Sequence, residues 1–451
     1  MSDQIELLFS TPAMSEAFSA PAHVKAMLAF EAGLALAEAR AGIIPPEAAR
    51  AIAAGCRVEL FDITSLYREA ALAGTPAIPL VRMLTAQVEG EAKKFVHWGA
   101  TSQDAIDTAL VLQMREGLHL LIEGLFAIAE DCANLADKHR QTLMPGRTLL
   151  QQALPITFGL KAARWLALVT RQLDALQGHC DRTLAVQLGG AAGTLASLGP
   201  KGLEVVEFLA EELKLAVPDL PWHTERDRVG EIAGTLGVVA GAMGKIGNDL
   251  VLLAQTEIAE ASEGAAPGKG GSSAMPHKRN PVDVTAALAA YRLAVGVVPV
   301  LLNAMVQEHE RAVGGWQAEW AAIPELFRYT ARAVEGIRGA VGNLQVDAAR
   351  MEANLNLTRG LVMAEALTMA LAQKVGRAEA YPIVQAACKL VAGSDKDLRQ
   401  VAQEDVRIRA ALTPEEIDRA VDPGQYLGST ATFIDRALAA YHRARSNRKS
   451  S

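Results

Sequence analysis

The chain has 451 residues and a net charge of −7, from 44 basic and 51 acidic side chains. A basic excess is typical of nucleic-acid-binding proteins, so this balance argues against that class of protein. Because 50% of the residues are hydrophobic, the chain can bury a large core, and its length allows two or three domains.

The cysteines and the first residues indicate a reducing compartment. The four cysteines are far apart, and none has the spacing of a zinc site or of a disulfide framework. The opening MSDQIELLFS lacks the basic cluster of a secretory signal peptide. We therefore expect a cytoplasmic protein without a metal site.

Proline placement predicts long helices. No proline occurs in residues 80–144, 156–199 or 222–266, and an interior proline would break a helix. Residues 104–140 also repeat apolar side chains at steps of three and four, which is typical of an amphipathic helix. Asp104 is a plausible N-cap for this helix.

Two apolar stretches predict close helix packing. Residues 229–262 carry a stripe of glycines at helical spacing, which lets a neighbouring helix approach closely. Residues 284–306 form the longest apolar run but contain Arg292, Pro299 and Asn303, which argues against a membrane span. We expect a fully buried bundle helix there and no membrane partner.

Strand signals are scarce and are confined to short stretches such as residues 147–151. These patterns predict an all-α protein whose long helices form a central bundle. We expect an N-terminal helical domain in residues 1–100, the bundle in residues 101–350 and a C-terminal helical domain in residues 351–451.

Two polar segments interrupt this pattern before the glycine stripe. Residues 97–104, HWGATSQD, place hydroxyls and backbone N–H groups at a predicted helix start, where a carboxylate or phosphate can bind. Simple capping by Ser102 or Asp104 would also explain them. Residues 146–155, GRTLLQQALP, could hold a polar ligand through Arg147, Thr148 and the glutamines, or could form an ordinary turn between helices.

Residues 270–281, GGSSAMPHKRNP, combine hydroxyls, glycines and positive charge. The glycines suggest a mobile loop that closes over a site, although a basic surface loop is the simpler reading. A serine hydroxyl is a poor base unless it is activated, and no Ser-His-Asp or G-x-S-x-G pattern accompanies it. Lys278 would supply positive charge and Asn280 an amide donor.

The stretch G-S-S-A-M-P-H-K-R-N-P resembles the signature loop of the fumarase/aspartase superfamily, G-S-S-x-M-P-x-K-x-N-P. The segments HWGATSQD and GRTLLQQALP resemble the other two shared regions of that superfamily, in the same order. The resemblance implies a central five-helix bundle, a homotetramer, and active sites that each combine the three regions from three subunits.

The resemblance also implies roles for individual residues. Ser272 would be the general base that removes a proton next to a carboxylate, with Ser273 as the alternative. Lys278 and Asn280 would bind that carboxylate and the aci-carboxylate formed from it. The remaining substrate-binding candidates are His97, Thr101, Ser102, Arg147, Thr148, Gln151 and Arg311. No cofactor is implied.

One departure from the superfamily pattern is informative. Most members read G-R-T-H-x-Q in the second region, and their His pairs with a Glu, but those positions hold Leu149 and Thr285 here. An amine or hydroxide needs a proton donor to leave, whereas a carboxylate, with a conjugate acid of pKa about 4, does not. The chain is thus similar to the branch that opens and closes a lactone on a small tricarboxylate substrate.

Two other functions remain possible from the sequence. A C–N or C–O lyase of the adenylosuccinate or argininosuccinate type fits the same loop, but the absent His at position 149 argues against it. A catalytically inactive structural relative is also known in this superfamily. It predicts a damaged loop, whereas Ser272, Lys278 and Asn280 are intact.

Overall fold

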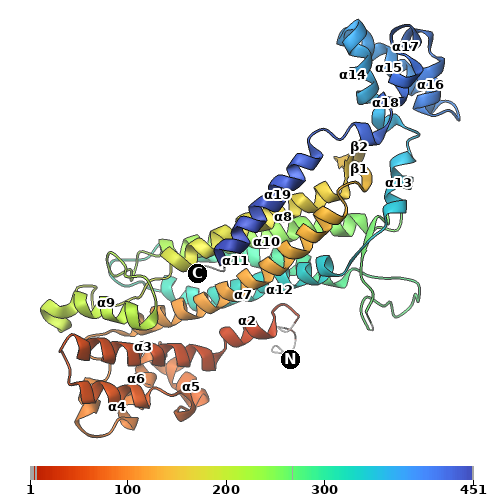
Figure 1. Ribbon diagram of the computed structural model, residues 1–451. Coiled ribbons are helices and arrows are strands. Elements are labelled where there is room, and N and C mark those ends of the chain that lie inside the picture. The colour runs from red at the N-terminus through yellow and green to blue at the C-terminus, as the bar shows by residue number, and fades with distance from the viewer. Residues whose placement is uncertain (1–4, 6–7, 267, 449–451) are drawn as a thin grey trace. The chain divides into compact units, whose positions relative to one another are not determined.

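The computed structural model describes residue 5, residues 8–266 and residues 268–448. Within these residues the chain is helical apart from two short antiparallel sheets, so the all-α class is confirmed. One sheet pairs β1 (Leu143–Thr148) with β2 (Gln151–Thr157), and the other pairs β3 (Ala261–Glu263) with β4 (Leu344–Val346) (Figure 1).

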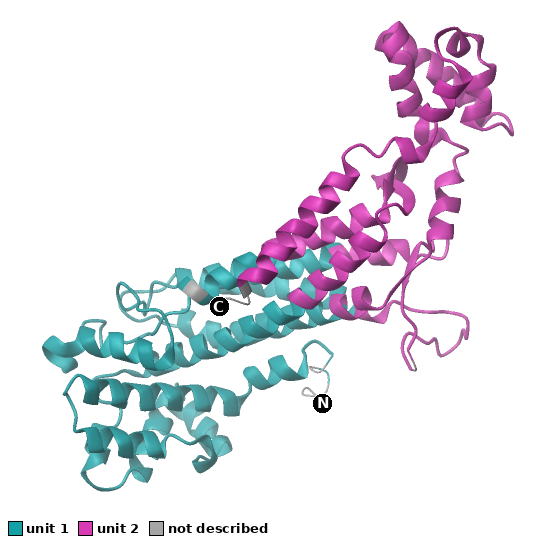
Figure 2. Ribbon diagram, viewed as in Figure 1, with its two compact units in different colours: residues 1–125, 172–245, 285–336 teal, residues 126–171, 246–284, 337–451 magenta. Residues whose placement is uncertain are grey.

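By the contacts between its residues, the chain separates into two compact units (Figure 2). The first unit comprises residues 1–125, 172–245 and 285–336, and the second comprises residues 126–171, 246–284 and 337–451. The division into domains at residues 100 and 350 stays a prediction. Five long helices contribute residues to both units: α7 (Ser102–Lys138), α8 (Phe158–Arg182), α10 (Asp227–Leu253), α11 (Val282–Ala304) and α12 (Gly315–Gly342).

The proline-free stretches each hold a long helix, as predicted. They contain α7, α8 and α10, whereas α11 and α12 continue past the internal prolines Pro299 and Pro324. The start of α7 differs from the prediction. It begins at Ser102, so Asp104 lies inside the first turn and is not the N-cap. Its carboxylate instead accepts hydrogen bonds from Thr101, Gly189, Gly190 and His223.

In the first unit, α7, α10, α11 and α12 pack against one another. Met114, Leu236, Leu301 and Phe327, one from each of these helices, line a single small internal void. All four side chains are at most 2% exposed. The packing of four helices around shared apolar contacts is the predicted bundle core.

The glycine stripe of α10 serves close packing in part. A Cβ atom on Gly230, Gly237 or Gly244 would lie 2.4, 2.9 or 2.8 Å from a side-chain atom of α11 or of Met305 directly after it. These three positions therefore need glycine for the approach of α11. A Cβ at Gly234 or Gly241 would meet nothing within 4 Å, so these two positions are not needed for the approach of α11.

The apolar helix α11 is less buried than the sequence suggested. The buried share of the most apolar 18-residue window is 28% in α11 and 56% in α10. Both helices reach the length and hydropathy of a membrane-spanning segment. Leu293, Val295, Val300 and Leu302 of α11 are each 40–47% exposed, so apolar side chains of this helix remain uncovered in a single chain.

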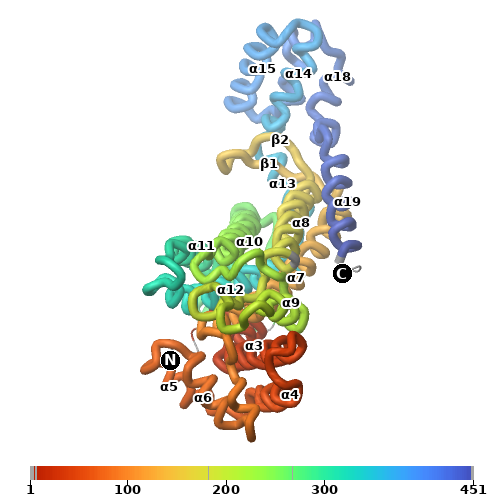
Figure 3. Tube along the Cα trace, turned by 90° about the vertical axis from the view of Figure 1, so that its left-hand side faces the viewer, coloured from red at the N-terminus to blue at the C-terminus, as the bar shows by residue number. Residues whose placement is uncertain are grey.

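The N-terminal part of the first unit is a layer of shorter helices beside α9 (Gly202–Leu213) (Figure 3). Thr11, Ser19 and Asp62 cap three of them by accepting a backbone N–H. The elements here are α2 (Pro12–Ala17), α3 (Ala20–Arg40), α4 (Pro46–Gly55), α5 (Ile63–Ala73), α6 (Ala77–Gln87) and the 3₁₀ turns Val58–Leu60, Gly90–Phe95 and Ala196–Lys201.

The second unit adds a cluster of short helices with its own apolar core, which includes Leu367, Leu371 and Val384. Its elements are α13 (Ala348–Asn356), α14 (Ala364–Val375), α15 (Arg377–Ala392), α16 (Leu398–Glu404), α17 (Val406–Ala411), α18 (Pro414–Ala420), α19 (Thr430–Arg448) and the 3₁₀ turns Leu361–Met363 and Pro423–Gln425.

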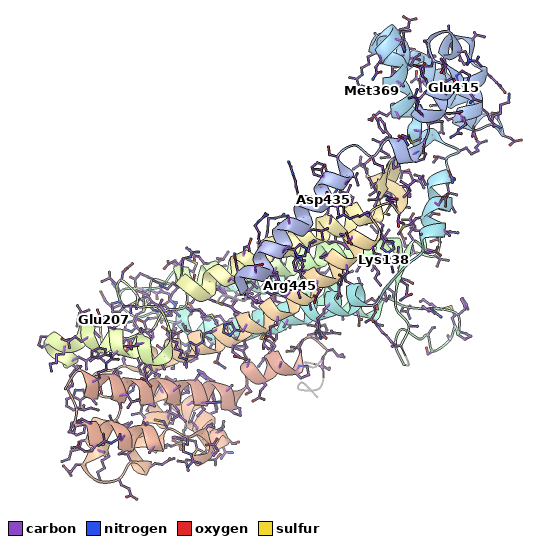
Figure 4. All side chains as sticks on the ribbon, in the orientation of Figure 1. Lys138, Glu207, Met369, Glu415, Asp435 and Arg445 are labelled. Atoms are coloured by element: carbon purple, nitrogen blue, oxygen red, sulfur yellow. The ribbon has the colours of Figure 1, made fainter. Side chains whose placement is uncertain are left out.

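Surface ion pairs join α19 to the C-terminal part of α7 and to the turn that follows it, within the second unit. Asp435 pairs with Arg140 at 2.8 Å, and Arg445 pairs with Glu130 at 3.2 Å (Figure 4). Asp435 and Arg445 each keep about half or more of the side chain exposed. Exposed pairs of this kind contribute little to the free energy of unfolding.

We predict that Gly117→Ala destabilises the protein. Alanine has the higher helix propensity by about 1 kcal/mol, but its Cβ would lie 2.6 Å from Cδ1 of Phe327, which is 1% exposed. Overpacking of a core costs about 1–3 kcal/mol, so the clash outweighs the propensity. A lower melting temperature in a thermal unfolding scan checks this.

Gly178→Ala is the matched control, because it also lies inside a helix and its Cβ would meet only Nη2 of Arg182, at 3.7 Å. It should raise the melting temperature slightly. If both variants shift it in the same direction, the packing argument is wrong.

Candidate active site

The structure distributes the predicted site residues between the two units. His97, Thr101, Ser102 and Arg311 belong to the first unit. The hairpin β1–β2 with Arg147, Thr148 and Gln151 and the loop with Ser272, Ser273, Lys278 and Asn280 belong to the second. Each unit thus holds some of the predicted site residues.

The carboxylate of Asp104 organises the first unit's part. The residue is 0% exposed and accepts four hydrogen bonds. Oδ2 receives them from the backbone N–H groups of Thr101 and Gly190, both at 2.9 Å. Oδ1 receives them from Gly189 N at 3.0 Å and His223 Nε2 at 2.7 Å. Asp104 therefore ties the segment before α7 to the Gly189–Gly190 turn.

Arg311 and Thr101, which are 210 positions apart, meet in the first unit. Arg311 Nη1 donates to Thr101 Oγ1 at 3.0 Å, and Nη2 donates to the carbonyl oxygen of Ala191 at 3.2 Å. Its Nε is buried and has no partner among the described residues. A donor without an acceptor beside a hydroxyl suits an anionic oxygen from a ligand. Ser102 lies next to this pair at the start of α7.

His97 is held by a residue that the sequence did not single out. Its Nδ1 lies 2.6 Å from Oε1 of Glu31, and the Glu31 side chain is only 1% exposed. Burial opposes a charge on the imidazole, but the carboxylates of Glu31 and Asp104 together raise the pKa of His97. The backbone of His97 has a φ of 58°, a left-handed conformation that few non-glycine residues adopt.

A buried ion-pair network continues from this region along α7. The guanidinium of Arg226, which is 1% exposed, donates to Asp107 at 2.8 and 3.0 Å and to Glu319 at 2.5 and 3.1 Å. Burial opposes its charge, yet the two carboxylates raise the pKa of Arg226. Trp316 Nε1 also donates to Asp107, at 2.9 Å. The network joins α7, α12 and the residue just before α10.

The second unit's hairpin engages Arg147 in an ion pair. Its Nη1 and Nη2 donate to Glu260 Oε2 and Oε1 at 2.8 and 2.6 Å, and Glu260 is 0% exposed. Asn354 Nδ2 donates to the same carboxylate at 2.9 Å. The charge of Arg147 is therefore matched within the chain, and its role in binding substrate stays a prediction. Thr148 and Gln151 are exposed.

The tip of the hairpin carries two leucines in the left-handed region. Thr148 pairs with Gln151, and Leu149 and Leu150 between them have φ of 50° and 64°. A two-residue turn of this form is normally made by Asn and Gly, because other side chains are strained there. Leu149 is 97% exposed and Leu150 is 70% exposed. The position where the superfamily resemblance places a histidine is thus presented outward.

The loop holds the Ser272 hydroxyl against backbone donors. Oγ of Ser272 accepts from the N–H groups of Met275 and Ala274, at 3.1 and 3.4 Å. Such donors stabilise negative charge on an oxygen atom. Asn280 N donates to Gly270 O at 2.9 Å, so the two ends of the loop are paired. Ser273 and Lys278 are exposed.

An anchor of three charged residues closes the base of this loop. Lys269 pairs with both Asp283 and Glu263. Glu263 in turn accepts from the backbone N–H of Val284 at 2.9 Å, at the start of α11. The loop therefore leaves and rejoins the helical framework at a fixed point.

None of the predicted site residues lines the cavity of about 670 Å³ in the first unit, which lies beside His23, Tyr67 and Trp320. Nor does any group of three or more His, Cys, Asp or Glu side chains in the described part of the chain have a metal-binding arrangement. What the site offers is a hydroxyl with N–H donors, amides and cations. These are the groups needed for proton transfer next to a carboxylate.

This helical framework and loop define a lyase-type subunit, and comparison with known proteins agrees. The lyase family model matches residues 7–296, and the model of the adenylosuccinate lyase C-terminus matches residues 360–437. The chain therefore belongs to the lyase family of the fumarase/aspartase superfamily, as the loop resemblance predicted.

Among its relatives, the chain is 48% identical to the 3-carboxy-cis,cis-muconate cycloisomerase of Pseudomonas aeruginosa, over 96% of this chain and 95% of that protein. It is 46% identical to the enzyme of the same name from Bradyrhizobium diazoefficiens, over 97% of each. The crystal structure of the 3-carboxy-cis,cis-muconate lactonizing enzyme from Pseudomonas putida matches with a TM-score of 0.91 at 43% identity, covering 98% of this chain and 99% of that chain.

We predict that Asp104→Asn destabilises the first unit by about 2–4 kcal/mol, because the new amide N–H₂ would face donors that have lost a carboxylate acceptor. Urea unfolding followed by circular dichroism measures the loss. Asp137→Asn, the same change at a 69% exposed position on α7, should alter the unfolding midpoint little. Equal midpoints for the two variants would contradict the role given to Asp104.

Proposed function

We propose that this protein converts 3-carboxy-cis,cis-muconate to its lactone, 4-carboxymuconolactone, in protocatechuate breakdown in the cytoplasm. The observation that carries the proposal is the absence of the acid dyad: position 149 holds a leucine at the exposed hairpin tip, and position 285 holds a threonine. The near full-length similarity to cycloisomerases supports the same reaction.

The reaction needs no acid at Leu149, because the group that adds and leaves is a carboxylate. One carboxylate of the substrate attacks an alkene carbon and forms the C–O bond of the lactone. The alkene electron pair moves onto the conjugated carboxylate and gives an aci-carboxylate. Lys278 and Asn280 hold this developing charge as cation and amide donor.

Ser272 then delivers its proton to the carbon next to the aci-carboxylate, which completes the C–H bond. The serine oxygen is left as an alkoxide. In the structure this oxygen accepts hydrogen bonds from the N–H groups of Met275 and Ala274, which would stabilise the alkoxide. Water restores the proton. The substrate starts with three carboxylates and the product keeps two, so each turnover takes up one proton. No cofactor or metal is required.

The other predicted residues bind the tricarboxylate. Thr101 and Arg311 are in contact, which supports a shared carboxylate site in the first unit together with Ser102 and His97. Thr148, Gln151 and Ser273 are exposed in the second unit and provide hydroxyl and amide donors. Arg147 contributes less charge than the sequence suggested, because Glu260 neutralises it.

The protein acts as a homotetramer in which each active site draws on several copies. Exposed apolar side chains adjoin all of the site segments: Trp98 at 42%, Leu149 at 97%, Met275 at 42% and Val313 at 85%. The uncovered face of α11 and the open glycines Gly234 and Gly241 of α10 offer a surface for a second copy. Association would bury these faces without a membrane.

Ser272→Ala should lower turnover of carboxymuconate by roughly 10²- to 10⁴-fold, the usual contribution of a positioned acid or base. Loss of ultraviolet absorbance by the conjugated diene measures the rate. Ser262→Ala, the same change at an exposed serine of the second unit, should keep full activity. Full activity of Ser272→Ala would reject the assignment, and Ser273→Ala would then be tested.

A lyase of the adenylosuccinate type is the second candidate function, and the match of residues 360–437 to that C-terminal family model favours it. Parallel ultraviolet assays with carboxymuconate and adenylosuccinate separate the two. Turnover of adenylosuccinate alone would reject the cycloisomerase. Turnover of neither would favour a catalytically inactive structural role.

We predict that Leu302→Lys disrupts the assembly, because it places a charge on the 47% exposed leucine of the α11 face. Sedimentation velocity should show smaller species with unchanged helical circular dichroism, and turnover should fall with the tetramer. Leu72→Lys, a charge on a 90% exposed leucine of α5, is the control and should sediment as the wild type. A monomeric wild type with full activity would contradict the shared site.

A further inference from the structure

Two acidic residues are buried in the apolar helix α3. Glu31 is 1% exposed and Glu38 is 0% exposed, and they lie seven positions apart, on one face of the helix. A buried carboxyl group is costly unless it is paired or neutral. Neither residue is explained by the fold, because the surrounding positions of α3 are filled with apolar side chains.

The two carboxyl groups differ in what they contact. Oε1 of Glu31 lies 2.6 Å from Nδ1 of His97. Oε2 of Glu31 and both oxygens of Glu38 have no partner among the described residues. Burial, and then repulsion from Glu31, raise the pKa of Glu38 to about 9. Glu38 is therefore neutral at neutral pH, and Glu31 is the one of the two carboxyl groups that contacts His97.

The contact with Glu31 fixes the orientation of the His97 imidazole. With Nδ1 turned to Glu31, Nε2 lies on the far side of the ring, and it makes no hydrogen bond to a described residue. The His97 side chain is 15% exposed. The left-handed backbone at His97 and the tie between Thr101 and Asp104 hold the same short segment. The ring thus has one nitrogen engaged by Glu31 and one without a hydrogen bond to a described residue, and it precedes Thr101 by four positions in the sequence.

We infer that Glu31 is a positioning residue, which orients the His97 imidazole through Nδ1 so that its Nε2–H binds a carboxylate of the substrate. This inference rests on the proposed function for the identity of the ligand. It assigns one of the three substrate carboxylates to a charge-assisted hydrogen bond from His97. Glu31 itself does not touch the substrate.

The charged groups around His97 give this inference a pH signature. Glu31 on α3 and Asp104 on α7 face the imidazole, with His223 bound to Asp104. Cys56 interacts with Glu31 but is neutral, because burial raises the pKa of its thiol to about 12. Since the pKa of His97 is raised, its cation is present below the ordinary value and is lost as pH rises through the folded one. Substrate binding should weaken over that upper window.

The test replaces Glu31 by Gln, which keeps the shape and removes the charge. Glu31→Gln should raise KM for carboxymuconate about tenfold at neutral pH with little change in kcat, and lower pH should restore KM. Titration of ¹³C-labelled histidine by NMR should show a lowered pKa for His97, whose signal is identified by its loss in His97→Gln.

Glu38→Gln is the matched control, since it makes the same change on the same helix at a carboxyl group that is already neutral. It should leave both KM and the His97 titration unchanged. The double variant Glu31→Gln/His97→Gln should have the KM of His97→Gln alone, because Glu31 acts through His97.

Several outcomes would overturn the inference. They are a wild-type His97 that titrates below the ordinary histidine value, a titration unaffected by Glu31→Gln, equal KM changes in Glu31→Gln and Glu38→Gln, or additive KM effects in the double variant. The wild-type titration decides even if Glu31→Gln fails to fold. A wild type that does not convert carboxymuconate would reject the proposed function instead, and the NMR result would stand separately.

Discussion

The predicted site residues of the first unit depend on one buried carboxylate. Asp104 accepts from two turns and one imidazole, so a single charge near the start of α7 fixes the segment from His97 to Thr101 and the Gly189–Gly190 turn together. Four donors satisfy the lone pairs that burial removes from water. Arg226 pairs with Asp107 of α7 and Glu319 of α12 and so links these two helices to the residue just before α10. Paired charges inside an apolar bundle thus hold this part of the first unit in place.

The long helices were predictable because their signal is local. Proline-free stretches and apolar periodicity located α7, α8 and α10, and the twelve residues of the loop, with the resemblance they carry, pointed to the superfamily. The pairings were not predictable. Asp104 meets His223 119 positions away, and Arg147 meets Glu260 113 positions away. No spacing rule reaches that far, so the sequence offered Arg147 as a candidate for ligand binding and Asp104 as a candidate helix cap. Glu31 was missed for the same reason.

Assembly and chemistry are coupled in the proposed mechanism through the burial of apolar surface. In a single chain, the strongly apolar helix α11 is largely exposed, which is unusual for the surface of a protein that acts alone. The leucines at the hairpin tip also contact solvent. A charge placed on such a face would therefore change turnover without touching a reacting group. Activity and association should be measured together, since a loss of one can report on the other.

The hairpin tip has a consequence for how this family changes its chemistry. The side chain at position 149 is almost wholly outside the folded chain, so exchanging it perturbs no core packing and no buried hydrogen bond. In a single copy, a histidine or a leucine would be tolerated about equally. In the proposed mechanism, the residue at the position that decides whether a leaving group receives a proton can thus change without a change in the surrounding fold. Divergence of reaction type within one architecture can begin at such a position.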